Sequence, residues 1–434
     1  MDIEALYDIF RTSKGIATDS RKVTKRQLFF ALQGENTDGN LFAAQAIARG
    51  ASCAVIDNPQ YAQGDKTFLV DNALEALQQL ANHHRKQFYI PIIAITGSNG
   101  KTTTKELVSA VLREHYETHA TQGNFNNHIG VPLTLLDMPD YAEVAVIEMG
   151  ANHINEITTL CEIAEPTHGL ITNIGKAHIG EFGGIEGVKR AKAELYRYLA
   201  KQNGMVFVNA DEPYLTELAT ANRKKLFYTY NSEPDINNIP IEVKHLQSQP
   251  FVSVSFLSDS GEEIIINSRL IGEYNCSNIM TAIALGKYFK VPSEKIKTAI
   301  EQYQPSNNRS QLLTVEQAQI ILDAYNANPS SMRAALQNLA NTPTPQIAIL
   351  GEMRELGIYS AQEHEDVLAY AQSFQFHAIA TIGTAFEKAS KRFDNIQHFA
   401  DAETLKWWLQ QQTKTPVTIL IKGSRGLQLE SLLS

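Results

Sequence analysis

The sequence predicts an α/β protein of three domains, and three observations lead to this fold class. The chain has 434 residues, too many for one hydrophobic core and enough for two to four domains. Apolar runs of strand length alternate with helical patterns in two separate blocks, which is typical of mostly parallel sheets covered by helices. Three segments between residues 240 and 270 alternate apolar and polar residues without helices between them, which indicates an antiparallel extension of one sheet. We expect a small α/β domain over residues 1–86, a central domain with the extended sheet over residues 87–302, and a smaller doubly wound, Rossmann-like domain over residues 303–434.

The first block holds short elements. Its strand candidates are residues 27–32 and 54–57, and its helical patterns cover residues 41–49 and 73–86. The second helix ends the block, and Pro91 precedes the first long apolar run of the next block.

The central block alternates strands and helices. Its strand candidates are residues 92–96, 144–148, 169–173, 205–209 and 226–230, followed by the extension at 241–243, 252–256 and 263–266. Its helical patterns are residues 104–115, 154–163, 185–200, 213–221 and 277–289.

The segment from Tyr303 to Arg309 contains Pro305, Ser306, Asn307 and Asn308, a composition typical of a linker. After it, strand candidates at residues 320–324, 347–350, 378–382 and 417–421 alternate with helical patterns. This alternation predicts the second doubly wound sheet.

Composition and charge exclude several classes of protein. A net charge of -9 argues against nucleic acid as the main partner, because phosphate backbones select basic surfaces. Cys53, Cys161 and Cys276 lie far apart, which argues against a disulfide framework or a zinc site, and we expect each to be a small buried hydrophobe. The acidic N-terminus lacks the apolar core of a signal peptide, and no apolar run is long enough to cross a bilayer. We therefore expect a cytoplasmic protein without membrane insertion.

The most informative segment is the turn after the first central strand, which reads Thr-Gly-Ser-Asn-Gly-Lys-Thr-Thr over residues 96–103. Between a strand and a helix, such a turn can cradle phosphates with backbone N–H groups, while a lysine adds charge and a threonine hydroxyl can ligate Mg²⁺. The alternative is an ordinary Gly/Ser/Asn turn. Gly-Lys-Thr in this context favours an ATP site on a P-loop type of sheet, although Ile95 stands where the usual motif has its first glycine. The nucleotide-binding residues predicted here are Thr96, Gly97, Ser98, Asn99, Gly100, Lys101, Thr102 and Thr103.

Two residues follow neighbouring strands at the same expected edge of the sheet. Glu148 ends the second central strand, at the carboxyl edge where ligands of open α/β sheets bind, and is a candidate Mg²⁺ ligand. The alternative is a solvated glutamate at a strand end. His178 follows the third strand, and it can be either a ligand at this edge or a satisfied core or surface histidine.

Lys192 stands on the apolar face of its predicted helix, in the series Ile185, Val188, Lys192, Leu195 and Leu199. A lysine facing a core costs several kcal/mol in desolvation or loses its proton. A neutral amine can take up CO₂ as a carbamate, an anion suited to a metal. The alternative is that the stem packs and the ammonium reaches solvent, and the residue pattern alone leaves both possibilities open.

Polar clusters mark three further places. Residues 272–278 precede a helix with asparagines at 275 and 278, which can cap that helix or contact a nucleotide. Residues 323–330 and 422–426 follow strands of the last domain and predict a polar lip at its carboxyl edge. A basic helix N-terminus opposes the helix dipole, so Lys422 and Arg425 favour anion binding over a structural role.

With these motifs together, the chain resembles the Mur ligases, the ATP-dependent amide-forming enzymes of peptidoglycan precursor synthesis. The resemblance covers essentially the whole length. Residues 96–102 look like the nucleotide loop of the family, Asn173 with His178 matches its N-x-x-x-x-H segment, and residues 186–194 look like the segment that bears a carbamylated lysine. The resemblance thus supports the carbamate interpretation of Lys192.

Within the family, four stretches resemble members that join D-alanyl-D-alanine to UDP-N-acetylmuramoyl-tripeptide: residues 123–136, 323–332, 351–357 and 422–425. Residues 18–21 and 28–32 resemble the part that holds the UDP-sugar. The Asp-Asn-Pro-Arg motif of diaminopimelate-adding relatives is not found.

The resemblance implies an ATP-dependent ligase that forms an amide bond through an acyl-phosphate intermediate. It also implies a role in cell wall synthesis, and hence in cell shape and division. The implied cofactors are ATP, two Mg²⁺ ions and a carbamylated Lys192, and we expect a monomer. The implied catalytic residues are Lys101, Glu148, His178, Lys192 and Arg309, and the implied metal site comprises Thr102, Glu148, His178 and Lys192. Asn173, Asn275, Arg309 and Asp323 would contact ATP. Ser20, Arg21, Asn124, Asn126, Asn127, Asn326, Ser424 and Arg425 would contact the other substrates.

Two other functions compete with this one. A related ligase acting on folate or on another amino acid would share the ATP core but would not need this N-terminal domain. A nucleotide-dependent switch would bind nucleotide without substrate-dependent hydrolysis, and it would have no use for Lys192 on an apolar face.

Overall fold

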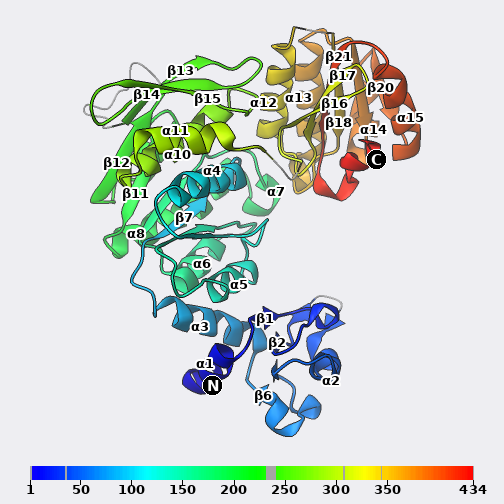
Figure 1. Ribbon diagram of the computed structural model, residues 1–434. Coiled ribbons are helices and arrows are strands. Elements are labelled where there is room, and N and C mark those ends of the chain that lie inside the picture. The colour runs from blue at the N-terminus through cyan, green and yellow to red at the C-terminus, as the bar shows by residue number, and fades with distance from the viewer. Residues whose placement is uncertain (1, 35–36, 231–240, 306–307, 344, 434) are drawn as a thin grey trace.

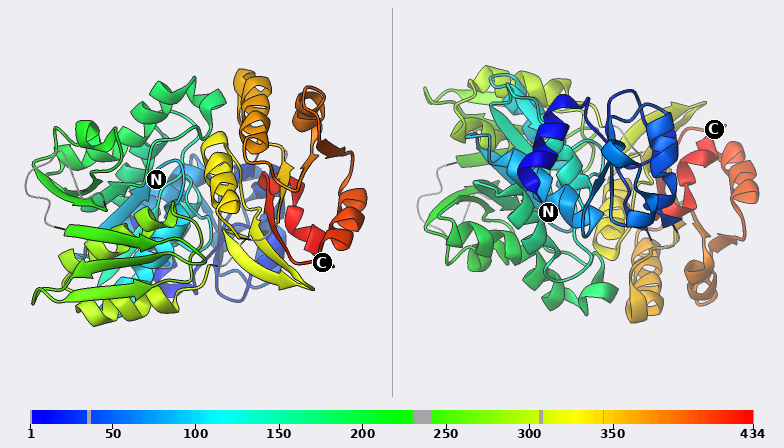
Figure 2. Two further views of the ribbon diagram at one scale, coloured as in Figure 1. Left: turned by 90° about the horizontal axis from the view of Figure 1, so that it is seen from above. Right: turned by 90° about the horizontal axis from the view of Figure 1, so that it is seen from below.

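The computed structural model describes residues 2–34, 37–230, 241–305, 308–343 and 345–433, and these form three domains in chain order (Figure 1). Figure 1 shows the N-terminal domain in blue at one end, the central domain in cyan to green, and the C-terminal domain in yellow to red. Seen from below, the N-terminal domain lies in front of the other two (Figure 2). The described sheets have four, nine and six strands, with a separate two-stranded pair, so the predicted three-domain α/β class is confirmed.

The N-terminal domain is a small parallel sheet with helices. Its strand order is β1-β2-β5-β6, and every pairing is parallel. Its elements are α1 (Ile3–Thr12), β1 (Ile16–Ala17), β2 (Leu28–Phe30), the pair β3 (Gln33–Gly34) and β4 (Thr37–Asp38), α2 (Ala43–Ala48), β5 (Cys53–Ile56), β6 (Thr67–Leu69) and α3 (Ala73–Arg85). Both predicted strands are confirmed, and the predicted helix at 41–49 is shorter because the chain enters it through a 3₁₀ turn, Gly39–Phe42.

Helix α3 joins the first domain to the second. Its buried Arg85 donates to the carbonyl oxygens of Ala164 at 2.9 Å and Glu165 at 3.1 Å, and Leu77 belongs to the same buried apolar cluster as Leu160. The guanidinium thus satisfies the end of a central helix, which fixes the first domain against the second.

The central sheet has the predicted parallel part and the predicted antiparallel extension, whereas its edge strand β8 (Thr118–Ala120) was not predicted. Its order is β15-β14-β13-β12-β11-β10-β7-β9-β8, parallel from β8 to β13 and antiparallel from β13 to β15. Its strands are β7 (Ile92–Thr96), β8 (Thr118–Ala120), β9 (Val144–Glu148), β10 (His168–Ile171), β11 (Met205–Asn209), β12 (Lys224–Thr229), β13 (Ile241–Gln247), β14 (Ser253–Leu257) and β15 (Glu263–Asn267). Its helices are α4 (Lys101–Arg113), α5 (Gly130–Leu136), α6 (Glu156–Ala164), α7 (Ile179–Phe182), α8 (Ile185–Lys201), α9 (Leu215–Leu218), α10 (Asn275–Tyr288) and α11 (Ser293–Gln302).

Two apolar clusters cover the faces of this sheet. The buried side chains of α4, α10 and α11 pack in one cluster, and those of α5, α6 and α8 pack in the other. The boundaries differ from the prediction at functional positions. Helix α4 begins at Lys101, directly after the turn, and β10 ends at Ile171 because Thr172 and Asn173 bond to that turn instead of continuing the strand.

The C-terminal domain is a six-stranded sheet of order β16-β17-β21-β18-β19-β20. Its elements are β16 (Gln311–Val315), β17 (Ala318–Asp323), α12 (Pro329–Ala340), β18 (Gln346–Gly351), α13 (Ser360–Gln372), β19 (Ala378–Ile382), α14 (Thr384–Ser390), β20 (Ile396–Phe399), α15 (Ala402–Gln412) and β21 (Val417–Lys422). The edge strands β16 and β20 were not predicted, because each exposes part of its length and lacks a continuous apolar run. The linker prediction at residues 306 and 307 lies outside the described residues.

All three cysteines are free and buried, as expected of small hydrophobes. Among the described residues, no helix is both long enough and apolar enough to cross a bilayer.

We predict that acid destabilises the central sheet through His168, which lies at the start of β10. Its ring packs on Phe207 and contacts Tyr288 and Phe289, and burial with the nearby Lys224 charge lowers its pKa from 6.5 to about 4. The folded state therefore binds fewer protons than the unfolded state between pH 6.5 and pH 4. The contribution of His168 to the free energy of unfolding is fully present above pH 6.5. It is lost as the pH falls towards 4, and the loss is at most ~3 kcal/mol.

Urea unfolding of the wild type and of His168→Phe across this pH range measures the effect. The wild type should lose more unfolding free energy than the variant, and equal slopes would contradict the assignment.

Candidate active site

A cavity of about 890 Å³ lies where the three domains meet. Leu74 and Gln78 of α3 line it from the N-terminal domain, and Ala334 of α12 lines it from the C-terminal domain. The predicted site residues that line it are Ser98, Asn99, Gly100, Lys101, Thr102, Thr103, Asn124, Asn126, Asn127, Glu148, Asn173, His178, Asn275, Arg309, Asp323 and Asn326. The structure therefore brings together residues that are up to about half the chain apart.

The turn after β7 needs both of its glycines. Gly97 has a φ of 142°, and a Cβ there would lie 2.0 Å from Thr172 Oγ1. Gly100 has a φ of 77° and precedes α4, with no side chain capping the helix. The first N–H groups of α4 thus lack a side-chain acceptor, which is the arrangement of an anion site at a helix N-terminus.

The end of the neighbouring strand β10 holds this turn in shape. The Asn173 side chain accepts from Asn99 N at 3.0 Å and donates to Asn99 O at 3.1 Å, and its carbonyl oxygen accepts from Ser98 N at 3.0 Å. Thr172 Oγ1 donates to Asn99 O at 2.6 Å. Asn173 is therefore a positioning residue of the turn.

Lys101 lies over the turn. Its Nζ donates to the carbonyl oxygens of Gly97 at 2.9 Å and Ser98 at 3.3 Å. Burial lowers the pKa of Lys101, and the negative charge of Glu148 acts in the opposite direction. The ammonium is thus held at the place where a phosphate would lie on the turn.

Glu148 has the features of a metal ligand. It is 1% exposed, and its Oε1 accepts from Asn126 Nδ2 at 2.8 Å and from Thr102 Oγ1 at 3.2 Å. Its Oε2 is buried and has no hydrogen-bond partner among the described residues. A buried carboxylate oxygen without a partner is costly, and a bound cation beside the Thr102 hydroxyl would satisfy it. The solvated glutamate considered from the sequence is excluded by this burial.

Lys192 is buried, 2% exposed, in the middle of α8. Its Nζ donates to Ala151 O at 3.2 Å and lies 5.3 Å from the centre of the Phe182 ring. Burial, together with the charge of Lys101, lowers its pKa to about 7. The expectation that this lysine faces inward is confirmed, and its ammonium does not reach solvent. Lys192 lies behind the cavity wall, since its partner Ala151 lines the cavity.

His178 lies between two domains. Its Nδ1 is 2.9 Å from a carboxylate oxygen of Glu355 in the C-terminal domain and 3.6 Å from one of Glu181. Sequence reasoning missed Glu355, because nothing local connects it with His178. Within the described residues, no three His, Cys, Asp or Glu side chains gather as a ready metal cluster.

The first turn of α10 borders the turn after β7 and the start of α4. Asn278 Oδ1 accepts from Thr104 Oγ1 at 2.9 Å, and Asn278 Nδ2 donates to Asn275 Oδ1 at 2.8 Å. Neither asparagine caps α10, whose first residue is Asn275, so the capping alternative is wrong. Across the cavity, the Arg309 guanidinium stacks 3.6 Å from the centre of the Tyr325 ring.

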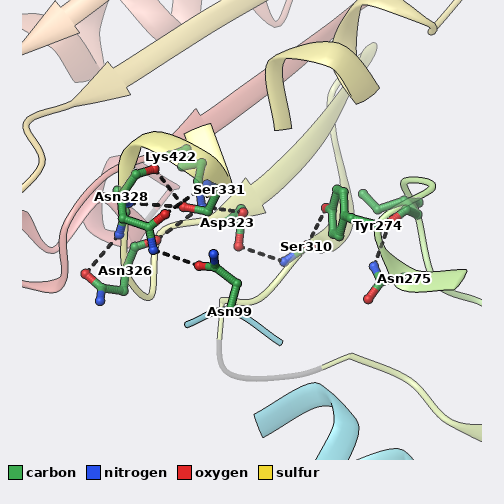
Figure 3. A network of polar contacts seen from close by, with 11 residues as sticks. Asn99, Tyr274, Asn275, Ser310, Asp323, Asn326, Asn328, Ser331 and Lys422 are labelled. Atoms are coloured by element: carbon green, nitrogen blue, oxygen red, sulfur yellow. Dashed lines mark hydrogen bonds and ion pairs between the residues drawn. The ribbon is translucent and has the colours of Figure 1, made fainter. Parts of the chain in front are cut away.

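Polar contacts join the central and C-terminal domains over the turn (Figure 3). Asn328 Nδ2 donates to Asn99 Oδ1 at 2.7 Å, and Asn328 also caps α12 through Ser331 N at 2.9 Å. Lys176 Nζ lies 2.5 Å from Glu363 of α13. These partners were not predicted from the sequence.

The inference that a structural role is the weaker explanation for Lys422 is wrong. Its Nζ donates to Asp323 Oδ2 at 2.6 Å and to Asn326 O at 3.1 Å, and Lys422 is 2% exposed (Figure 3). Arg425 likewise pairs with Glu430. The buried ammonium of Lys422 lies between two strand ends and fixes the loop after β17. This structural role explains why Lys422 stands at the polar lip.

Several predicted residues do not line the cavity. Ser424 is buried and its Oγ accepts from Arg354 N at 2.9 Å. Ser20 donates to Gln45 in the N-terminal domain at 2.8 Å, and the exposed Arg21 pairs with Asp19 at 2.9 Å. Thr96 and Gly97 support the turn from below, with Thr96 Oγ1 donating to Met149 O at 2.7 Å.

Comparison with protein families gives three consecutive matches. Residues 12–85 match the model described as Mur ligase family, catalytic domain, residues 95–286 match the Mur ligase middle domain, and residues 308–425 match the Mur ligase, glutamate ligase domain.

Individual relatives match over nearly the whole chain. The chain is 35% identical to UDP-N-acetylmuramoyl-tripeptide--D-alanyl-D-alanine ligase of Bacillus subtilis (strain 168), covering 96% of this chain and 92% of that protein. It is 32% identical to the protein of the same name from Escherichia coli (strain K12), covering 97% and 93%. A crystal structure of MurF from Acinetobacter baumannii superposes with a TM-score of 0.87 at 31% identity, covering 99% and 97% of the two chains. A MurF ligase from Thermotoga maritima in complex with ADP has the same fold, with a TM-score of 0.87 at 24% identity over 98% and 97%.

Proposed function

The chain belongs to the Mur ligase family, and we propose that it joins D-alanyl-D-alanine to UDP-N-acetylmuramoyl-tripeptide at the expense of ATP, in peptidoglycan precursor synthesis. One structural observation supports this proposal independently of the names of the chain's relatives. The phosphate turn opens into a cavity that all three domains line, so a nucleotide and two further substrates can meet in it. We infer that the reaction takes place in the cytoplasm, because its substrates are ATP and UDP-linked precursors, and that the protein acts as a monomer, because described residues of one chain line the cavity.

We assign a different substrate to each of the three domains. Residues 1–86, with Ser20 and Arg21, would hold the UDP-sugar, and residues 87–302 would hold ATP. Residues 303–434 would supply Arg309 and Asp323 to the nucleotide and Asn326 to the dipeptide. Ser424 and Arg425 do not line the cavity, so they would contact the dipeptide only after the domains close further. Asn124, Asn126 and Asn127 line the wall between the first two domains, where the peptide of the tripeptide substrate would extend.

We infer that two Mg²⁺ ions bind in this cavity. Thr102 and the unpartnered Oε2 of Glu148 would hold the first beside the phosphates, and Glu148, His178 and carbamylated Lys192 would hold or support the second. Carbamylation turns a buried cation into an anion, which suits a site whose wall already carries Lys101. Such cations neutralise charge on the phosphates and on the reacting carboxylate.

In the first step, the terminal carboxylate of the tripeptide attacks the γ-phosphorus of ATP. A bond forms between the carboxylate oxygen and phosphorus, the bond to the β-γ bridging oxygen breaks, and ADP leaves. The chain contributes position and charge, with the α4 N-terminus and Lys101 on the phosphates.

In the second step, the amine of D-alanyl-D-alanine attacks the acyl carbon and forms a tetrahedral intermediate. The bond from carbon to the phosphate oxygen then breaks, inorganic phosphate leaves and the amine loses a proton. The C-terminal domain brings Asn326 and Arg309 to the same cavity, so the domains must be closed for this step.

An acceptor exchange tests the proposal against a related ligase. Phosphate release with ATP and UDP-N-acetylmuramoyl-tripeptide should require D-alanyl-D-alanine. Diaminopimelate, lysine or glutamate should not replace the dipeptide, and faster release with any of the three would assign the chain to another ligase reaction.

A further inference from the structure

Glu212 is a carboxylate on the cavity wall that the mechanism above does not use. It follows β11 by three residues, in a loop that is tied to the first turn of α10. Asn209 Oδ1 accepts from Asp211 N at 3.0 Å, and Asn209 Nδ2 donates to Ser277 Oγ at 3.1 Å. These bonds place Glu212 at the α10 corner of the cavity.

The neighbouring acid, Asp211, has side-chain and backbone partners, whereas the Glu212 carboxyl has none among the residues that the structure describes. Asp211 accepts from Thr229 Oγ1 at 2.6 Å and from Tyr230 N at 2.9 Å. No hydrogen bond or ion pair joins the Glu212 carboxyl to another side chain in the described part of the chain. Burial and the Asp211 charge raise the pKa of Glu212 to about 7. A partly buried carboxyl with free hydrogen-bonding capacity, on the wall of a cavity, is a suitable acceptor for a donor group of a ligand.

The sheet order indicates which ligand group lies there. The phosphate turn follows β7, and Glu148 follows it on one side, at the end of β9, whereas β10 and β11 lie on the other side. On that other side Asn278 Oδ1 lies only 2.6 Å from where a Cβ of Gly100 would stand. A nucleotide with its phosphates on the turn and its γ-phosphate towards Glu148 therefore extends its nucleoside past α10, towards Glu212.

The chemistry of a carboxylate selects among the groups of the substrates. It repels phosphates and peptide carboxylates, and it accepts hydrogen bonds from neutral donors. The nucleoside of ATP presents such donors as the ribose hydroxyls and the exocyclic amine of adenine. We propose that Glu212 is a specificity-determining residue of the nucleotide site, and that its carboxyl accepts a hydrogen bond from a donor group on the nucleoside of ATP. This inference rests on the use of ATP in the proposed function.

Calorimetric titration of the full chain with nucleoside diphosphates tests it without the peptide substrates. The ligands are ADP, 2′-deoxy-ADP, 3′-deoxy-ADP and purine riboside 5′-diphosphate, which lacks the amine. The proteins are the wild type, Glu212→Ala, Glu212→Gln and, as a matched control, Glu217→Ala on the exposed side of α9. Glu212→Ala should weaken ADP binding about tenfold, which is the usual effect of losing one hydrogen bond to a charged group. Glu212→Gln keeps an acceptor oxygen and should lose less, and Glu217→Ala should bind ADP as the wild type does.

The analogues identify the donor. The analogue that lacks this donor group should bind the wild type about tenfold more weakly than ADP does. Its affinity should fall little further when Glu212 is replaced by alanine. Unchanged ADP binding in Glu212→Ala overturns the proposal, as does an equal loss for ADP and all three analogues. If Glu212→Ala does not fold, Glu212→Gln carries the same comparison. A wild type that binds no ADP would refute the use of ATP itself, whereas ADP binding without ligation would refute only the proposed reaction.

Discussion

Replacing Lys192 by alanine will reduce amide ligation by about a thousandfold while the protein stays folded. Lys192 is 2% exposed and its pKa is lowered to about 7, so its side chain can exist as the neutral amine that forms a carbamate. Alanine removes the anion that would hold a cation beside the acyl phosphate, and such electrostatic stabilisation accounts for effects of this size. Phosphate release with all three substrates measures the loss, and thermal unfolding shows whether the fold persists.

Two further variants separate the carbamate from simple packing. Acetate or formate should restore part of the activity of Lys192→Ala, because a short carboxylate can occupy the vacated space. Lys192→Met fills that space and should not be rescued. Lys201→Ala, at the exposed end of the same helix, should keep wild-type activity. Full activity in Lys192→Ala would refute the carbamate.

Replacing Lys101 by methionine will have an effect of similar size for a different reason. Lys101 Nζ lies over the turn, 2.9 Å from Gly97 O, where the β- and γ-phosphates would bind. Methionine keeps the stem but removes the charge that stabilises the transferred phosphoryl group. We expect turnover to fall by about 10²- to 10³-fold and ADP binding to weaken.

Initial rates and ADP titration measure the two effects of Lys101→Met. Arg113→Met is the matched control, since Arg113 is exposed at the far end of α4. If Lys101→Met turned over at the wild-type rate, the turn would not be the phosphate site.

The sequence was sufficient to predict where a residue lies in the fold wherever that residue contrasts with its local pattern. The series with spacings of three and four placed Lys192 on the apolar face of α8, and its burial confirms that prediction. The strand, the turn and Lys101 stand together within ten residues, so predicting this strand-turn-helix segment needed no information about distant contacts. The place of Glu148 on the cavity wall agrees with the rule that ligands of open α/β sheets bind where parallel strands end.

Contacts between distant segments could not be predicted in the same way. Lys422 and Asp323 are 99 residues apart, and only the pairing of β17 with β21 brings them within 2.6 Å. His178 with Glu355 and Asn99 with Asn328 depend on how two domains dock, which no local pattern encodes. The short helix α9 was predicted too long, because the helical pattern over residues 213–221 forms only four helical residues in the structure.

The stoichiometry of the reaction tests the account most directly. With ATP, UDP-N-acetylmuramoyl-tripeptide and D-alanyl-D-alanine present, mass spectrometry should detect the tripeptide substrate extended by one dipeptide with loss of water. One ADP and one phosphate should form for each amide bond, and no phosphate should form when the tripeptide is omitted. Phosphate release that continues without the tripeptide, or that proceeds without the extended product, would contradict the assignment of this cavity to amide ligation.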